Sequence, residues 1–137
     1  MLAELAALAP VDALFINQGH FGNPGNLSVQ GTVSLVGPLL RARDKGQVRQ
    51  LYWKTTTRSQ RGPYDSALER AWVAANLLPA GFRVLDLGGL TEGSLWQLAE
   101  GMGGSATWDG LHFRPFAYRG FNLAMLAGLC SPGGLGG

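Results

Sequence analysis

Residues 48–55 read Val-Arg-Gln-Leu-Tyr-Trp-Lys-Thr and follow a Lys-Gly turn. Because β-branched and aromatic side chains favour extended backbone, this run predicts a strand. Two further apolar runs predict strands before and after it, namely Ala-Leu-Phe-Ile-Asn at residues 13–17 and Phe-Arg-Val-Leu-Asp-Leu at residues 82–87. Gly88-Gly89 is expected to end the last of these strands.

The remaining segments show helical spacing. Apolar residues from Ser28 to Arg43 recur every three or four positions, with Pro38 as a discordant member, so we expect a helix that is kinked or ends early. Helices are also expected from about Tyr64 to Leu78 and from Phe116 to Leu129, with a short one at residues 95–102. The apolar stripe of the Tyr64–Leu78 helix consists of Leu68, Ala71, Trp72, Ala75 and Leu78.

Three strands that alternate with helices imply right-handed crossovers and a parallel sheet, so the predicted fold class is α/β. The content of 46% hydrophobic and 15% charged residues is typical of a folded chain and excludes general disorder. We expect a single domain over residues 1–130, followed by a Gly-rich tail at residues 131–137.

Charge and composition exclude several kinds of partner. The net charge of +2, from 11 basic and 9 acidic residues, is too small for a nucleic-acid surface. No apolar stretch approaches the ~20 residues of a membrane span, and the first ten residues lack the basic region of a secretory signal. With one cysteine, Cys130, and two histidines lacking a third ligand at standard spacing, we expect no disulfide, metal or cofactor.

Reactive groups in parallel α/β sheets gather in loops at the carboxyl ends of strands. Three segments here end in such loops: residues 17–20, residues 55–57, and the stretch from Asp86 to His112. The two histidines of the chain, His20 and His112, both lie in these loops.

Asp109 and His112 have the spacing of an acid–base pair. A carboxylate three residues before a histidine can reach its Nδ1 atom and leave Nε2 available as a base. General-base assistance is worth roughly 10²- to 10⁴-fold in rate when a nucleophile is within hydrogen-bond reach. Asp-x-x-His also matches by accident, and in the alternative interpretation Asp109 caps the last helix while His112 packs against Trp108.

Four blocks of the sequence resemble an esterase family. Trp-Asp-Gly-Leu-His-Phe-Arg-Pro at residues 108–115 is similar to the final block of SGNH/GDSL-type esterases. Residues 12–21, residues 51–56, and Asp86 followed by Leu90-Thr91 resemble the PC-esterase and trichome-birefringence-like branch of that family. The blocks occur in the order of the family and cover roughly residues 12–126.

This resemblance implies a three-layer α/β/α sandwich and O-acyl ester chemistry, either hydrolysis or acetyl transfer, often on carbohydrate. Carried over by position, His112 is the base and Asp109 orients it, while Asn17, Gly19 and His20 line the oxyanion side. The implied partner is an acylated carbohydrate or another small acyl ester, and the implied location is the secretory pathway or the Golgi.

The sequence departs from the family at the nucleophile, because no Gly-Asp-Ser block occurs in the 137 residues. We therefore expect the acid–base half of the site only, in a chain that is truncated, completed by another segment, or a degenerate relative. The first two strands of the family sheet would also be missing. An exposed apolar edge and poor solubility would follow.

Two other function classes remain open. Arg83-Val84-Leu85-Asp86-Leu87-Gly88-Gly89 resembles the first motif of Rossmann-like methyltransferases, although Leu90 and Glu92 break the glycine spacing. Alternatively, the chain is a non-catalytic carbohydrate-binding or structural remnant of the esterase fold. Aromatic residues near the candidate site could then stack on sugar rings, namely Trp53, Trp108, Phe113 and Tyr118.

Overall fold

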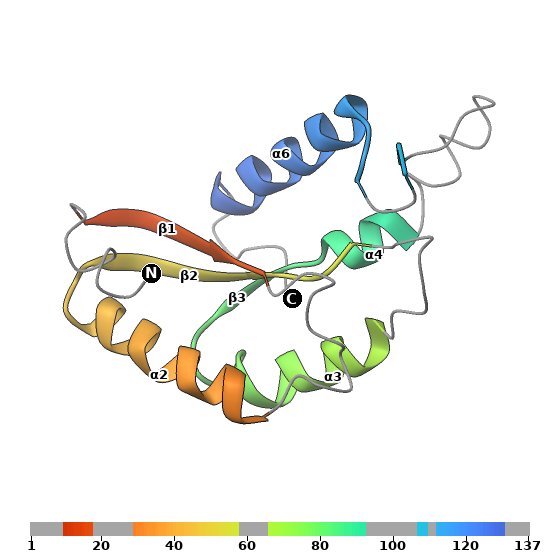
Figure 1. Cartoon of the computed structure of the whole chain (residues 1–137). Coiled ribbons are helices and arrows are strands. Elements are labelled where there is room, and N and C mark those ends of the chain that lie inside the picture. Colours follow the sequence, from red (N-terminus) through yellow and green to blue (C-terminus); the bar gives the residue numbers. More distant parts are fainter. Residues whose placement is uncertain (1–9, 18–28, 58–65, 93–106, 110–111, 131–137) are drawn as a thin grey trace.

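The computed structural model describes residues 10–17, 29–57, 66–92, 107–109 and 112–130. Their secondary structure alternates between strands and helices along most of the chain (Figure 1). The elements are β1 (Val11–Ile16), α2 (Val29–Asp44), β2 (Val48–Lys54), α3 (Ser66–Asn76), β3 (Arg83–Leu85), α4 (Leu87–Glu92) and α6 (Pro115–Cys130).

The three strands form one parallel sheet in the order β1-β2-β3. β2 lies in the middle, with Leu14 opposite Leu51 on one side and Trp53 opposite Val84 on the other. The predicted α/β class with a parallel sheet is therefore confirmed. The three expected strands are present, although β3 is shorter than its apolar run.

Helices cover both faces of the sheet, which gives three layers (Figure 1). Side chains alternate between the two faces of a strand. In β2, Leu51 and Trp53 point toward α2 and α3, whereas Tyr52 points to the other face, where its hydroxyl lies 3.4 Å from the backbone oxygen of Gly128 in α6. Phe15 of β1 stacks on Tyr52, with ring centroids 4.7 Å apart.

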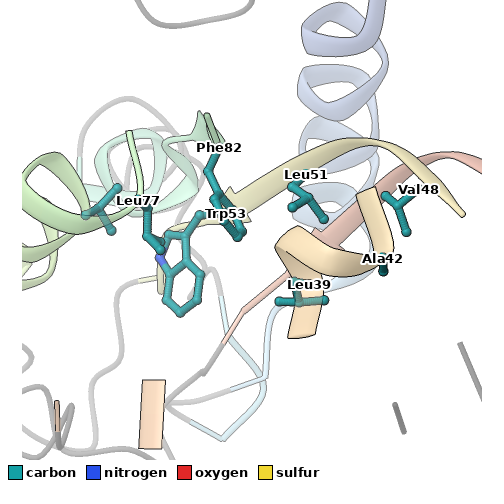
Figure 2. Close-up of a cluster of buried hydrophobic side chains, with 8 residues drawn as sticks. Leu39, Ala42, Val48, Leu51, Trp53, Leu77 and Phe82 are labelled. Atoms are coloured by element: carbon teal, nitrogen blue, oxygen red, sulfur yellow. The ribbon is translucent and has the colours of Figure 1, made fainter. Parts of the chain in front are cut away.

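The larger core lies between the sheet and the helices α2 and α3, and Figure 2 shows its side chains. Full burial of a large apolar side chain stabilises a fold by roughly 1.5–3 kcal/mol, so this core holds α2 and α3 against the sheet. The buried members are Leu39, Ala42, Val48, Leu51, Trp53, Val73, Leu77 and Phe82.

A smaller core joins α6 to the other face of the sheet. It contains Leu85 and Leu87, against which Phe113, Ala117 and Phe121 pack. Phe113 and Phe121 meet edge to face with ring centroids 5.1 Å apart. The expected helix is therefore present and buries one side only. Its exposed large apolar side chains are Phe116, Tyr118, Leu123, Leu126 and Leu129.

One expected alternative and one expected boundary are wrong: the helix over residues 28–43 does not end early, and the third strand stops before its glycines. α2 continues past Pro38 to Asp44, because its C-terminal half is held by burial of Leu39 and Ala42 even though a proline cannot donate the usual backbone hydrogen bond. The third strand ends at Leu85, and Gly88-Gly89 lies inside α4. Asp86 causes this change, because its Oδ1 accepts a 3.0 Å hydrogen bond from the Gly89 amide and caps the helix.

The buried face of α3 also differs from the predicted stripe. Of the predicted stripe, Trp72 packs against the larger core, but Leu68 and Leu78 are about half exposed. The buried positions are instead Glu69, Val73 and Leu77, at intervals of four residues. The helix is rotated in this way because Glu69 binds polar groups of β2 and of the loop that follows it. The predicted short helix at residues 95–102 and the tail at 131–137 lie outside the described residues.

Gly88→Ala is expected to destabilise the fold by about 1–3 kcal/mol, since overpacking has a cost of this order. An added Cβ would lie 2.7 Å from the backbone oxygen of Thr56, which cannot move independently of the chain. Urea unfolding measures the loss. The matched control is Gly37→Ala in α2, where among the described residues the new methyl meets only Arg41 at 3.4 Å, and this change should stabilise by about 0.5–1 kcal/mol. Equal effects of the two substitutions would contradict the close approach at Gly88.

Candidate active site

A short turn carries the proposed acid–base pair. Thr107 and Phe113 form an antiparallel bridge, and the Trp108 amide donates to the His112 oxygen at 2.8 Å. The Trp108 indole also donates to the Phe113 oxygen at 3.0 Å. Because Phe113 is buried in the smaller core beside Leu87, the turn is anchored at the carboxyl end of β3, where α4 begins.

Asp109 contacts His112 through both carboxylate oxygens. Oδ2 lies 2.9 Å from Nδ1 of the ring, and Oδ1 accepts a 2.8 Å hydrogen bond from the His112 amide. The expected contact between carboxylate and imidazole is thus present. A carboxylate acceptor favours a proton on Nδ1, which leaves the Nε2 lone pair available in the neutral ring.

The ring of His112 is open to solvent, with its side chain 68% exposed. Within the described residues, Nε2 makes no hydrogen bond. α6 begins at Pro115, so the amide that Asp109 binds lies outside that helix. The guanidinium of Arg114 lies over the Trp108 ring, with its central carbon 5.3 Å from the ring centroid. The contacts described for Asp109 therefore lie within the turn, and those of the Trp108 side chain are with Phe113 and Arg114.

The expected oxyanion loop is described only at its first residue. Asn17 follows β1 and donates from Nδ2 to the backbone oxygen of Lys54 at 2.9 Å. This hydrogen bond joins the ends of β1 and β2, two of the three loops that the sequence singles out. Gly19 and His20 lie outside the described residues.

Glu69 is a buried carboxylate that sequence reasoning missed. It is 2% exposed and lies under the loop that follows β2. Oε1 accepts from the Trp53 indole at 2.9 Å, and Oε2 accepts from the Thr56 amide at 2.9 Å. The four-residue spacing of Glu69 with Val73 and Leu77 is the signal that could have revealed it.

Polar contacts also explain the paired glycines after β3. The Gly88 amide donates to Thr55 Oγ1 at 2.7 Å, and this hydroxyl donates to Asp86 Oδ1 at 2.8 Å. The Gly89 amide binds the same Asp86 oxygen. Both amides are therefore engaged within the protein, so the glycines have a structural use that does not depend on the methyltransferase interpretation.

Lys54 is the charged group at the end of the central strand. Partial burial lowers the pKa of its ammonium from 10.5, and the negative charge of Glu69 opposes this shift. Among the described residues, no group of three or more His, Cys, Asp or Glu side chains could hold a metal, and no helix is long and apolar enough to cross a bilayer.

Comparison with protein-family models, with curated proteins and with solved structures found no match. The resemblance to SGNH and PC-esterase proteins therefore remains a prediction that rests on the four sequence blocks. The geometry of the Asp109 and His112 side chains is an independent observation.

Proposed function

We propose that this chain carries the acid–base pair of an acyl-ester hydrolase or acyltransferase, with His112 as the base and Asp109 as its orienting partner. The observation that carries the proposal is the 2.9 Å contact between Asp109 Oδ2 and His112 Nδ1 on an exposed ring. The position of the pair at the carboxyl end of a parallel strand adds support, because ligands of α/β sheets bind there.

In the proposed reaction, Nε2 of His112 removes the proton of a hydroxyl group as its oxygen bonds to the acyl carbon. The carbonyl electrons move to oxygen and form an oxyanion. When the ester C–O bond breaks, Nε2 returns the proton to the leaving sugar oxygen. Asp109 stabilises the imidazolium in between and keeps the ring in the Nδ1-protonated form.

The attacking hydroxyl is not assigned to a serine, because the sequence contains no Gly-Asp-Ser block. The role of His112 is the same for a serine hydroxyl, for water or for the hydroxyl of an acceptor sugar. Water as the final acceptor gives hydrolysis, and a sugar gives acyl transfer. The proposed substrate class is O-acetylated carbohydrate.

Asp109→Asn is expected to lower hydrolysis of p-nitrophenyl acetate by roughly 10²-fold or more, because an amide does not enforce the productive tautomer. The matched control is Asp12→Asn, since Asp12 is 93% exposed and pairs only with Arg49 in the part of the chain described. Equal rates for the wild-type chain and Asp109→Asn would contradict the proposal. So would a folded wild-type chain that hydrolyses no faster than buffer.

A carbohydrate-binding function is the second candidate, and the exposure of Trp108 favours it. The residue is 65% exposed, and the face of its ring away from Arg114 offers an aromatic surface for a sugar ring. Acetylated xylo-oligosaccharides separate the two functions. Release of acetate supports the ester proposal, whereas binding without release, lost in Trp108→Ala, supports the carbohydrate-binding alternative.

A further inference from the structure

Lys54 lies on the same face of the sheet as the turn that bears His112. Its Cα partner in the parallel register is Leu85. Partner residues in adjacent strands point to the same face, and Leu85 packs against Phe113 in the smaller core. The Lys54 side chain therefore projects from the carboxyl end of β2 toward the side on which Phe113 anchors the turn.

The ammonium of Lys54 is partly buried without a contacting anion. Within the described residues it makes neither an ion pair nor a side-chain hydrogen bond. Burial lowers the pKa of this ammonium, and the negative charge of Glu69 offsets only part of that effect. Lys45, the other lysine of the sequence, is exposed in a turn. A partly desolvated cation that no anion contacts directly is poised to bind one, because the bound anion replaces the lost hydration.

The first loop brings a second polar group to the same place. Asn17 binds the backbone oxygen of Lys54, so its amide group lies directly beside the end of β2. Asn17, Lys54 and Asp86 occupy the ends of three adjacent strands, and Asp86 is already engaged by Thr55 and Gly89. Among these three residues at the carboxyl edge of the sheet, Lys54 is the one that carries a positive charge.

We propose that the Lys54 ammonium binds the oxyanion that forms on the acyl carbonyl in the reaction assigned to His112. This inference rests on the proposed function and adds a catalytic residue to it. A donor aimed at developing negative charge typically contributes about 10²- to 10³-fold in rate. The ammonium supplies such a donor from the central strand, whose backbone is fixed on both sides.

The test compares Lys54→Met with Lys45→Met, which removes the only other lysine. The probe is p-nitrophenyl methylphosphonate, a stable anion that mimics the tetrahedral oxyanion, with binding measured by calorimetry. Lys54→Met should weaken binding by roughly 10- to 100-fold and lower ester hydrolysis by about 10²- to 10³-fold. Lys45→Met should change neither quantity.

Stability provides a readout that separates binding from a structural role. Burial disfavours the charge of Lys54 and the negative charge of Glu69 favours it, so Lys54→Met should shift the midpoint of thermal unfolding little while it lowers phosphonate affinity. A fall in both quantities would show that Lys54 is structural and would overturn the inference.

The remaining outcomes distinguish this inference from the proposed function. If Lys54→Met binds the phosphonate as the wild type does while Asp109→Asn still slows hydrolysis, the Lys54 inference fails and the ester proposal stands. If the phosphonate binds through Lys54 but no ester is hydrolysed, the anion site stands and the ester proposal fails. A wild-type chain that does not bind the phosphonate overturns the inference.

Discussion

Replacing Glu69 with alanine is expected to destabilise the folded chain by about 3–5 kcal/mol, a large share of the roughly 5–15 kcal/mol that holds a small domain together. The substitution removes the acceptor of the Trp53 indole and of the Thr56 amide, and also that of the Thr56 hydroxyl. Each unsatisfied buried donor costs about 1–3 kcal/mol. The loop at the carboxyl end of β2 would lose its fixed position together with this stability.

Urea unfolding followed by circular dichroism measures the effect. Glu69→Gln is the matched control, because its amide oxygen can still accept from Trp53 while its NH₂ group cannot accept from the Thr56 amide. We expect the glutamine variant to lose less than half as much stability as the alanine variant. A change below about 0.5 kcal/mol in Glu69→Ala, the range of ordinary surface substitutions, would show that this carboxylate is not structurally required.

His112→Gln is expected to lower the rate of ester hydrolysis by about 10²- to 10⁴-fold, the usual range for loss of a general base. Glutamine is similar in size and keeps hydrogen-bonding groups, but it cannot take up a proton near neutral pH. Because the ring is 68% exposed and outside both cores, the unfolding free energy should change by less than about 0.5 kcal/mol.

The assay follows p-nitrophenolate release, with Arg49→Gln as the control. Arg49 is 78% exposed near the amino end of β2, at the opposite end of the strand from the proposed site. Unchanged hydrolysis in His112→Gln would remove the base assignment. A large loss of stability would show that the ring is structural, and the rate could then no longer be attributed to proton transfer.

The fold was predictable where local sequence and burial agree. The β-branched and aromatic run of β2 is buried on both faces, as a central strand should be, and it was identified from composition alone. The last helix was also identified within one residue at each end. Which of its residues meet the sheet could not be predicted, because apolar side chains occur on several sides of this helix.

The rotation of α3 was not predictable from hydrophobicity. Leucines at 68 and 78 suggested one face, and the polar network of Glu69 selected another. Such a choice depends on a partner in β2 that lies sixteen residues away in sequence, at Trp53. The capping of α4 by Asp86 was missed for a different reason, since paired glycines more often break structure than occupy a helix.

In the candidate site, too, local contacts could be predicted from the sequence and long-range contacts could not. The contact between Asp109 and His112 is local, so spacing alone could anticipate it. The positions of Asn17 and Lys54 depend on strand register and could not be read from either segment by itself. Gly19 and His20 stay predictions, because they lie outside the described residues.

The layer formed by α6 and the His112 turn buries fewer apolar side chains against the sheet than the layer formed by α2 and α3. α6 buries only Ala117, Phe121 and Gly128 among its described residues, whereas α2 and α3 share the larger core. Regions with few buried apolar contacts open in partial unfolding before the whole domain does. On warming, we therefore expect α6 and the Asp109–His112 turn to unfold while the amides of the three strands are still protected from hydrogen exchange. Any activity that depends on His112 should then be lost at a lower temperature than the midpoint of global unfolding.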